Sequence, residues 1–239
     1  MLRKLKSWAE DYIYLVSLYG KTVWYRTPPE EYLGYTKQTK VPIILIPGVN
    51  TTWQFMKIIA DEVSRVGHPI YILKDLGYNR KEIPESADIA RALIDKENLQ
   101  NVIILAHSKG GLIGKELLIN SNEDSRIAKV ITIATPFSGS RLAKVVPGTT
   151  MKELRPDSKI ILDHNINSDV NKNIISIYGI FDHYVWPTES CHLEGAENIQ
   201  VPVDGHHKIL SYPGAREIVI EKIALITALL EKQAVVDAL

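Results

Sequence analysis

Short runs of apolar residues alternate along this chain with longer segments whose apolar positions recur every three or four residues. A short apolar run is typical of a buried strand, and the longer spacing is typical of an amphipathic helix. The runs lie at 41–47, 69–73, 102–106, 127–134, 174–178 and 199–203, and the helical segments at 51–66, 86–99, 112–119 and 217–231. Strands that alternate with helices and are apolar along their whole length predict a mostly parallel sheet with helices on both faces.

Residues 139–173 interrupt this alternation, because they contain apolar positions but no strong strand pattern. A long connection within a compact domain is often functional, which favours a cap or lid-like insertion. A pair of ordinary covering helices explains the pattern equally well, and the two interpretations are compatible. We expect one α/β domain over residues 41–239 that includes this insertion, preceded by a separate segment, 1–40. Ser86 is expected to cap the helix that it begins.

The N-terminal segment has a helical periodicity of its own, with a wide apolar and aromatic face over its first 19 residues. Gly20 is the expected end of that helix. The favoured interpretation is that the helix packs on its own domain or on a second subunit, and the sequence does not decide the oligomeric state. The alternative is peripheral membrane contact through residues 1–20, with Arg3, Lys4 and Lys6 directed towards lipid headgroups.

The same segment bears on localisation. Its basic start is similar to that of a signal peptide, but Glu10 and Asp11 interrupt the apolar region and no convincing cleavage site follows. No run of 18 apolar residues occurs in the chain, so no transmembrane helix is expected. The protein is therefore expected in the cytoplasm, with peripheral attachment to a membrane as the alternative.

Composition narrows the classes of function. The chain of 239 residues is 45% hydrophobic, which is enough for one substantial core. Its 28 basic and 28 acidic residues cancel and form no long basic run, so no nucleic-acid partner is expected. Cys191 is the only cysteine, which excludes an intrachain disulfide. Cys191 and the adjacent His192 are too few ligands for a metal site, and Cys191 is interpreted as an ordinary loop thiol.

The most informative stretch is 101–111, Asn-Val-Ile-Ile-Leu-Ala-His-Ser-Lys-Gly-Gly. A strand pattern ends at a sharp turn with Ser108 at its apex, and a helical pattern follows directly. Ala106 and Gly110, two residues before and after the serine, are small enough for the strand and the helix to approach closely. This is the pattern of a nucleophile elbow, which presents a serine hydroxyl to a base. The string alone is also compatible with a serine that caps an ordinary helix.

A serine nucleophile at such an elbow is followed along the chain by an acid and then by a histidine. Asp182 comes just past the 174–178 strand, at the end of a strand where open parallel sheets place their ligands. His206 follows Gly205 in the loop before the final helix, and is preferred to His207. The other downstream candidates lie in irregular or polar stretches or too close to a partner; they are Asp157, Asp163, Asp169, Asp204, His183 and His192.

Two backbone N–H groups are expected to bind an oxyanion. That of Lys109 follows the nucleophile and begins a helix, whose dipole favours negative charge. The other is assigned to Val49, in the loop after the first strand, where Gly48 permits a tight bend. Trp53 and Phe137, together with residues of the 139–173 insertion, are the expected lining of an acyl pocket.

Together these residues resemble the α/β-hydrolase superfamily, and most strongly its small bacterial triacylglycerol lipases and esterases with an Ala-His-Ser-x-Gly-Gly elbow. The resemblance extends from residue 41 to the final helix, and residues 1–40 lie outside it. It departs from the family pattern at Ala106, where glycine is usual, and at Pro47, where histidine is usual before the glycine. The matching segments are 47–49, 106–111, 135–139, 179–182 and 205–206.

The resemblance implies a compact α/β-hydrolase fold and a serine carboxylester hydrolase that cleaves small-molecule or lipid esters through an acyl-enzyme. It implies no metal and no organic cofactor. Two alternatives stay open because one fold serves many functions. The amphipathic N-terminus and Lys109 favour a lipid deacylase or acyltransferase at a membrane, and the other alternative is a non-catalytic binding protein on the same fold.

Overall fold

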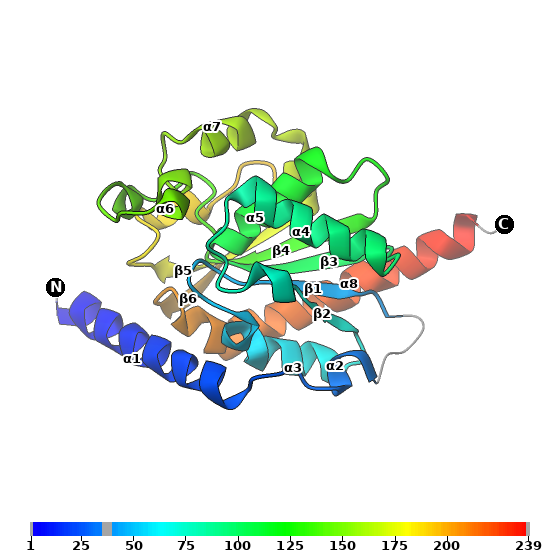
Figure 1. Cartoon of the computed structure of the whole chain (residues 1–239), viewed down its shortest axis with the longest axis horizontal. Coiled ribbons are helices and arrows are strands. Elements are labelled where there is room, and N and C mark those ends of the chain that lie inside the picture. The colour runs from blue at the N-terminus through cyan, green and yellow to red at the C-terminus, as the bar shows by residue number, and fades with distance from the viewer. Residues whose placement is uncertain (1, 35–39, 238–239) are drawn as a thin grey trace.

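The computed structural model describes residues 2–34 and 40–237, and its six strands form one parallel sheet in the order β2-β1-β3-β4-β5-β6 (Figure 1). Because all the strands run in the same direction, their carboxyl ends lie along one edge of the sheet, and the loops that follow them meet there. The strands are β1 Ile43–Ile46, β2 Ile70–Ile72, β3 Val102–His107, β4 Ile127–Ile133, β5 Ile174–Phe181 and β6 Glu197–Asp204.

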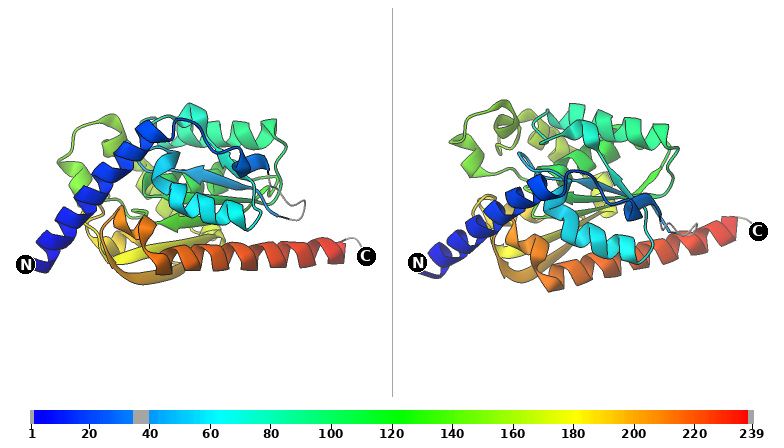
Figure 2. Two further views of the ribbon diagram at one scale, coloured as in Figure 1. Left: turned by 90° about the horizontal axis from the view of Figure 1, so that it is seen from below. Right: turned by 60° about the horizontal axis from the view of Figure 1, so that its bottom comes forward.

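Helices cover both faces of this sheet, as the alternating pattern predicts (Figures 1 and 2). In β1, Ile43 and Leu45 pack on the face covered by α3 and α8, whereas Ile44 and Ile46 pack on the face covered by α4 and α5. Both faces of the strands are therefore apolar, which explains the uninterrupted apolar runs. The helices are α1 Leu2–Trp24, α2 Glu31–Gly34, α3 Lys57–Arg65, α4 Ile83–Lys96, α5 Lys109–Asn120, α6 Thr149–Glu153, α7 Lys159–Ile166 and α8 Pro213–Asp237.

Two predicted helix boundaries are wrong. Helix α1 does not end at Gly20 but continues to Trp24. A glycine costs a helix only about 1 kcal/mol and ends it mainly where its backbone is left-handed, which is not the case at Gly20. Helix α4 begins at Ile83 rather than being capped by Ser86, because Pro84 suits the first turn of a helix and Ser86 is buried within that turn.

The 139–173 segment forms short helices and no strand. Its two α-helices, α6 and α7, are flanked by 3₁₀ turns at Arg141–Lys144 and Asp169–Asn173. Leu154 and Ile161 bury their side chains in the core on the face covered by α4 and α5. The segment therefore packs as covering helices do, and its movement as a lid stays a prediction.

Helix α1 packs on the 3₁₀ turns at Trp53–Met56 and Lys208–Ser211, which belong to loops at the carboxyl edge of the sheet. The two ends of the described chain point away from each other, with the start of α1 and the end of α8 at opposite sides of the molecule (Figure 2). Over the described ranges, none of the helices is both long and apolar enough to cross a membrane.

Candidate active site

Ser108 lies at the turn between β3 and α5. Its φ of 54° is in the left-handed region, which is strained for a residue with a side chain and is typical of a nucleophile elbow. The backbone N–H of Ser108 donates to the Ile133 carbonyl at 2.9 Å and fixes the turn. A Cβ at Gly110 would lie 2.1 Å from the carbonyl oxygen of Ile46, so only glycine allows this approach. The helix can therefore start close against β1 and present the hydroxyl at the edge of the sheet.

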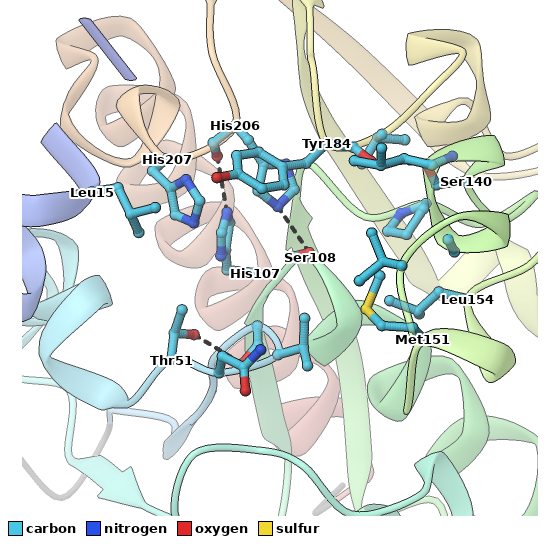
Figure 3. A pocket seen from close by; sticks show the side chains of 18 of the residues that line it. Leu15, Thr51, His107, Ser108, Ser140, Met151, Leu154, Tyr184, His206 and His207 are labelled. Atoms are coloured by element: carbon cyan, nitrogen blue, oxygen red, sulfur yellow. Dashed lines mark hydrogen bonds between the residues drawn. The ribbon is translucent and has the colours of Figure 1, made fainter. Parts of the chain in front are cut away.

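The structure brings Ser108, His206 and Asp182 together in one buried hydrogen-bonded chain. The Nε2 atom of His206 lies 2.9 Å from Ser108 Oγ (Figure 3). The Nδ1 atom of His206 lies 2.6 Å from Asp182 Oδ2. Asp182 directly follows β5, and His206 lies two residues after β6. The three side chains therefore come from the ends of different strands, in the order along the chain that the sequence predicts; their catalytic roles stay a prediction.

The carboxylate of Asp182 sets the tautomer of His206. Its Oδ1 accepts from the backbone N–H groups of Tyr184 and Val185 at 2.8 and 2.9 Å, which leaves Oδ2 for the histidine. The His206 Nδ1–H donates to that oxygen, so Nε2 is free to accept from the Ser108 hydroxyl. Burial alone lowers the pKa of His206, but the charge and hydrogen bond of Asp182 outweigh burial, and the pKa is raised above its ordinary value.

No protein-family model matches the sequence, and no curated protein matches it. Among solved structures, the chain is similar to the mature lipase BlEst2 of Bacillus licheniformis, with 15% identity, a TM-score of 0.64, and 80% of this chain and 95% of that chain covered. Aspergillus fumigatus lipase B is similar too, with 17% identity, a TM-score of 0.62, and 82% of this chain and 55% of that chain covered. Paleococcus ferrophilus monoacylglycerol lipase has 12% identity and a TM-score of 0.57, with 79% of this chain and 96% of that chain covered. The chain has the α/β-hydrolase fold.

The backbone groups predicted to bind an oxyanion lie beside the serine of this α/β-hydrolase fold. Lys109 is the first residue of α5, and Val49 lines the same cavity as Ser108. A Cβ at Gly48 would lie 3.1 Å from the Cβ of Ser108, so glycine lets this loop pass close to the nucleophile. The binding role of the two N–H groups stays a prediction.

The side chain of Lys109 turns away from the cavity. It is fully buried, and its Nζ donates to the backbone carbonyls of Asn79, at 3.3 Å, and Lys81. Burial lowers its pKa to about 8 despite the acidic residues nearby. The amine therefore fixes a loop and is not available to a lipid headgroup, so Lys109 gives no support to a membrane function.

The Ser108 hydroxyl faces a cavity of about 270 Å³ (Figure 3). Leu15 and Tyr19 of α1 line one side of it, and Met151 and Leu154 of the 139–173 segment line another. The lining is mainly apolar, as ligand sites commonly are. The 139–173 segment thus contributes to the cavity as the sequence predicts, whereas the contribution of α1 was not predicted.

Trp53 and Phe137 do not line this cavity, so their predicted role is wrong. Trp53 packs in the core against Tyr32, with ring centroids 6.0 Å apart, and Phe137 is 1% exposed within the opposite core cluster. Both residues lie in loops near the carboxyl ends of the strands, where the cavity is. The sequence shows that proximity but not the direction of each side chain.

Asp11 of α1 is a residue of the site that sequence reasoning did not assign. Its Oδ1 accepts from the backbone N–H groups of His207 and Lys208 at 2.8 and 2.7 Å, and its Oδ2 lies 3.2 Å from His207 Nδ1. A Cβ at Gly205 would lie 2.6 Å from Oδ1. The carboxylate is fully buried, holds the loop directly after His206 and lies close to Gly205 before it. The sequence contained one indication of this role, because Asp11 is an acidic residue within the apolar face of a predicted helix.

Electrostatics agree with this geometry. Burial alone raises the pKa of Asp11, but the hydrogen bonds and charge of His207, with the N–H of Lys208, lower it to about 2. Asp11 is therefore an anion, and its charge adds to that of Asp182 in raising the pKa of His206.

His107, next to the nucleophile, supports the histidine loop from the other side. Its Nε2–H donates to the backbone carbonyl of His206 at 3.0 Å. Burial, with smaller contributions from His206 and His207, lowers the pKa of His107 well below its ordinary value. The ring is therefore neutral and acts as a fixed hydrogen-bond donor.

Cys191, interpreted from the sequence as an ordinary loop thiol, is buried at the end of the 3₁₀ turn Thr188–Cys191. Burial raises the pKa of its thiol well above the ordinary value, which argues against a role as a nucleophile. Within 2–34 and 40–237, no three His, Cys, Asp or Glu side chains are grouped as a metal site would need.

Proposed function

We propose that this α/β-hydrolase is a serine carboxylester hydrolase. The observation that carries the proposal is the buried chain of hydrogen bonds from Ser108 Oγ through His206 to Asp182. A serine is a weak nucleophile until a base accepts its proton, and the neutral Nε2 of His206 is placed to do so. The solved structures of similar fold include proteins named as lipases, which supports the same broad class of reaction.

In the proposed reaction, Ser108 Oγ attacks the ester carbonyl carbon while His206 Nε2 takes the hydroxyl proton. The carbonyl oxygen becomes an oxyanion between the N–H groups of Val49 and Lys109. The tetrahedral intermediate collapses, the bond to the alcohol breaks, and His206 returns the proton to the leaving oxygen. Water then attacks the acyl-enzyme by the same steps and releases the acid. The carboxylate of Asp182 orients His206 and stabilises the imidazolium.

The decisive experiment combines a fluorophosphonate probe with ester hydrolysis. We expect the probe to label Ser108, and Ser108→Ala to abolish labelling and reduce turnover on the order of a million-fold, because the nucleophile is lost. Circular dichroism checks that the variant is folded. Ser140→Ala is the matched control: its hydroxyl lies on the same cavity but donates to the Tyr184 carbonyl instead of meeting a histidine.

Labelling of Ser140, or full hydrolysis by folded Ser108→Ala, would show the proposal to be wrong. A folded wild-type protein that neither reacts with the probe nor hydrolyses any ester would favour a non-catalytic binding protein. The second enzymatic candidate, a lipid deacylase or acyltransferase at a membrane, is favoured by one observation, the outward apolar face of α1 beside the cavity.

A further inference from the structure

Helix α1 is oriented with its apolar side away from the domain. A surface helix normally turns its apolar face to the core and its polar face to water. In α1, Ser7 and Asp11 are buried, together with Leu18. Eight large apolar or aromatic side chains are exposed to solvent beside the exposed Lys6; they are Leu5, Trp8, Tyr12, Ile13, Val16, Tyr19, Val23 and Trp24. Exposed apolar surface of this extent indicates an interaction site.

This orientation is held by specific contacts. The Asp11 carboxylate accepts the backbone N–H groups of His207 and Lys208, and Glu10 forms an ion pair with the Lys208 side chain. The ring of Tyr19 packs on Phe55 with centroids 5.0 Å apart. The helix cannot roll over to bury its apolar face without breaking these contacts. The described part of the chain therefore leaves this apolar face uncovered.

The exposed face adjoins the active-site cavity. Leu15 and Tyr19 of α1 line the cavity, and Leu142 and Val146 line it from residues 141–157. Val145, beside these two, is 77% exposed. Figure 1 shows α1 and α6 on opposite sides of the carboxyl edge of the sheet. Two elements with exposed apolar side chains thus flank one cavity.

Both elements are also basic. Residues 1–26 contain five basic and two acidic residues, a formal charge of +3, and residues 141–157 contain four basic and two acidic residues, a formal charge of +2. The whole chain has zero formal charge, so positive charge is concentrated here. All four acids have partners: Glu10 pairs with Lys208, Asp11 with the histidine loop, Glu153 with the backbone N–H of Ile83, and Asp157 with Lys144 of the same segment.

We propose that α1 and residues 141–157 form a docking surface for an anionic lipid bilayer. Exposed Trp and Tyr suit the boundary between headgroups and acyl chains, and Lys and Arg suit anionic headgroups. A second copy of the chain is a poorer fit, because a symmetric contact would place two basic surfaces against each other. The proposal concerns binding and does not depend on the chemistry at Ser108.

The test is co-sedimentation of the full chain with vesicles of equimolar phosphatidylglycerol and phosphatidylcholine. We expect binding that falls with added salt and with pure phosphatidylcholine, because charge attraction is screened or absent there. The triple variant Ile13→Gln, Val16→Gln and Val23→Gln should lose vesicle affinity by about tenfold or more, because three apolar contacts with the bilayer are removed. The three residues do not line the cavity.

The matched control replaces three apolar residues of similar exposure at the far end of α8, Leu229→Gln, Val235→Gln and Val236→Gln, and should bind like the wild type. Hydrolysis of a soluble ester by both triple variants at the wild-type rate shows that they are folded. If the reaction at Ser108 were absent altogether, circular dichroism would serve instead, so the two proposals fail separately. Undiminished binding by the α1 variant overturns the docking proposal. So does a wild type that ignores vesicles but forms a dimer that the α1 variant abolishes.

Discussion

At the scale of single residues, two adjacent histidines have different environments. His206 contacts Ser108 and Asp182, whereas His207 contacts Asp11 through both its backbone N–H and its Nδ1. The two neighbouring side chains therefore have different contacts: His206 faces the nucleophile, and His207 anchors the loop to Asp11. Substitutions at these positions should separate the two roles.

We expect His206→Ala to reduce kcat by several orders of magnitude, because Ser108 then has no base. His207→Ala should cost much less, since it removes one contact to Asp11 and leaves the backbone N–H donors. Steady-state rates on one soluble ester compare the two variants. A larger loss in His207→Ala than in His206→Ala would contradict the assignment.

Asp11 is expected to act as a positioning residue and to set the pH range of the reaction. His206 works as a base only when neutral, so activity falls as the pH drops through its pKa, which is raised above the ordinary value. Asp11→Asn removes a negative charge, which lowers that pKa and moves the acid limb of the pH profile to lower pH. Loss of the loop anchor should also reduce kcat/KM roughly tenfold.

The control for Asp11→Asn is Glu10→Gln, which removes a charge from the same helix. Among the described residues, the Glu10 carboxylate pairs with Lys208 and Lys6 and not with the histidine loop. Its acid limb should stay where the wild type has it. A purely structural role for Asp11 would lower the rate at every pH without displacing the limb.

At the scale of elements, the start of α5 depends on how closely it approaches β1. Gly110→Ala would place a methyl group 2.1 Å from the Ile46 carbonyl oxygen, and we expect it to lower the free energy of unfolding by about 2 kcal/mol or more. Gly20→Ala in α1 meets no atom within 4 Å, and should raise that free energy by roughly 0.5–1 kcal/mol through helix propensity. Urea unfolding followed by circular dichroism measures both. Equal effects of the same sign would contradict the close approach.

At the scale of the whole molecule, the sheet, the 139–173 segment and α1 together limit what reaches Ser108. The cavity of about 270 Å³ is slightly smaller than the usual range for small-ligand sites, which begins at about 300 Å³. We therefore expect kcat/KM on p-nitrophenyl esters in solution to fall by about tenfold or more from butyrate to palmitate. A rate that rises with chain length would indicate that residues 139–173 move aside as a lid.

The amino-acid pattern was sufficient to predict the layers of the fold and the order of the reactive residues along the chain. Uninterrupted apolar strands such as 102–106 require burial on both faces, and burial of that kind needs helices on both sides. A serine between two small residues, followed by Asp182 and His206 after later strands, was enough to name three residues that the structure brings together. These features are local, or follow from the common direction of parallel strands.

Tertiary contacts determine which side chains face the cavity and which face of α1 points outward. Trp53 and Phe137 lie in loops at the carboxyl edge of the sheet, but their side chains turn into the core. Packing against partners that are distant in sequence sets that direction. Asp11 meets the loop after β6 across 196 residues of chain, and no periodic pattern encodes that contact. The hydrophobic pattern of α1 predicts a helix with an apolar face, but the buried hydrogen bonds of Asp11 decide that this face points outward.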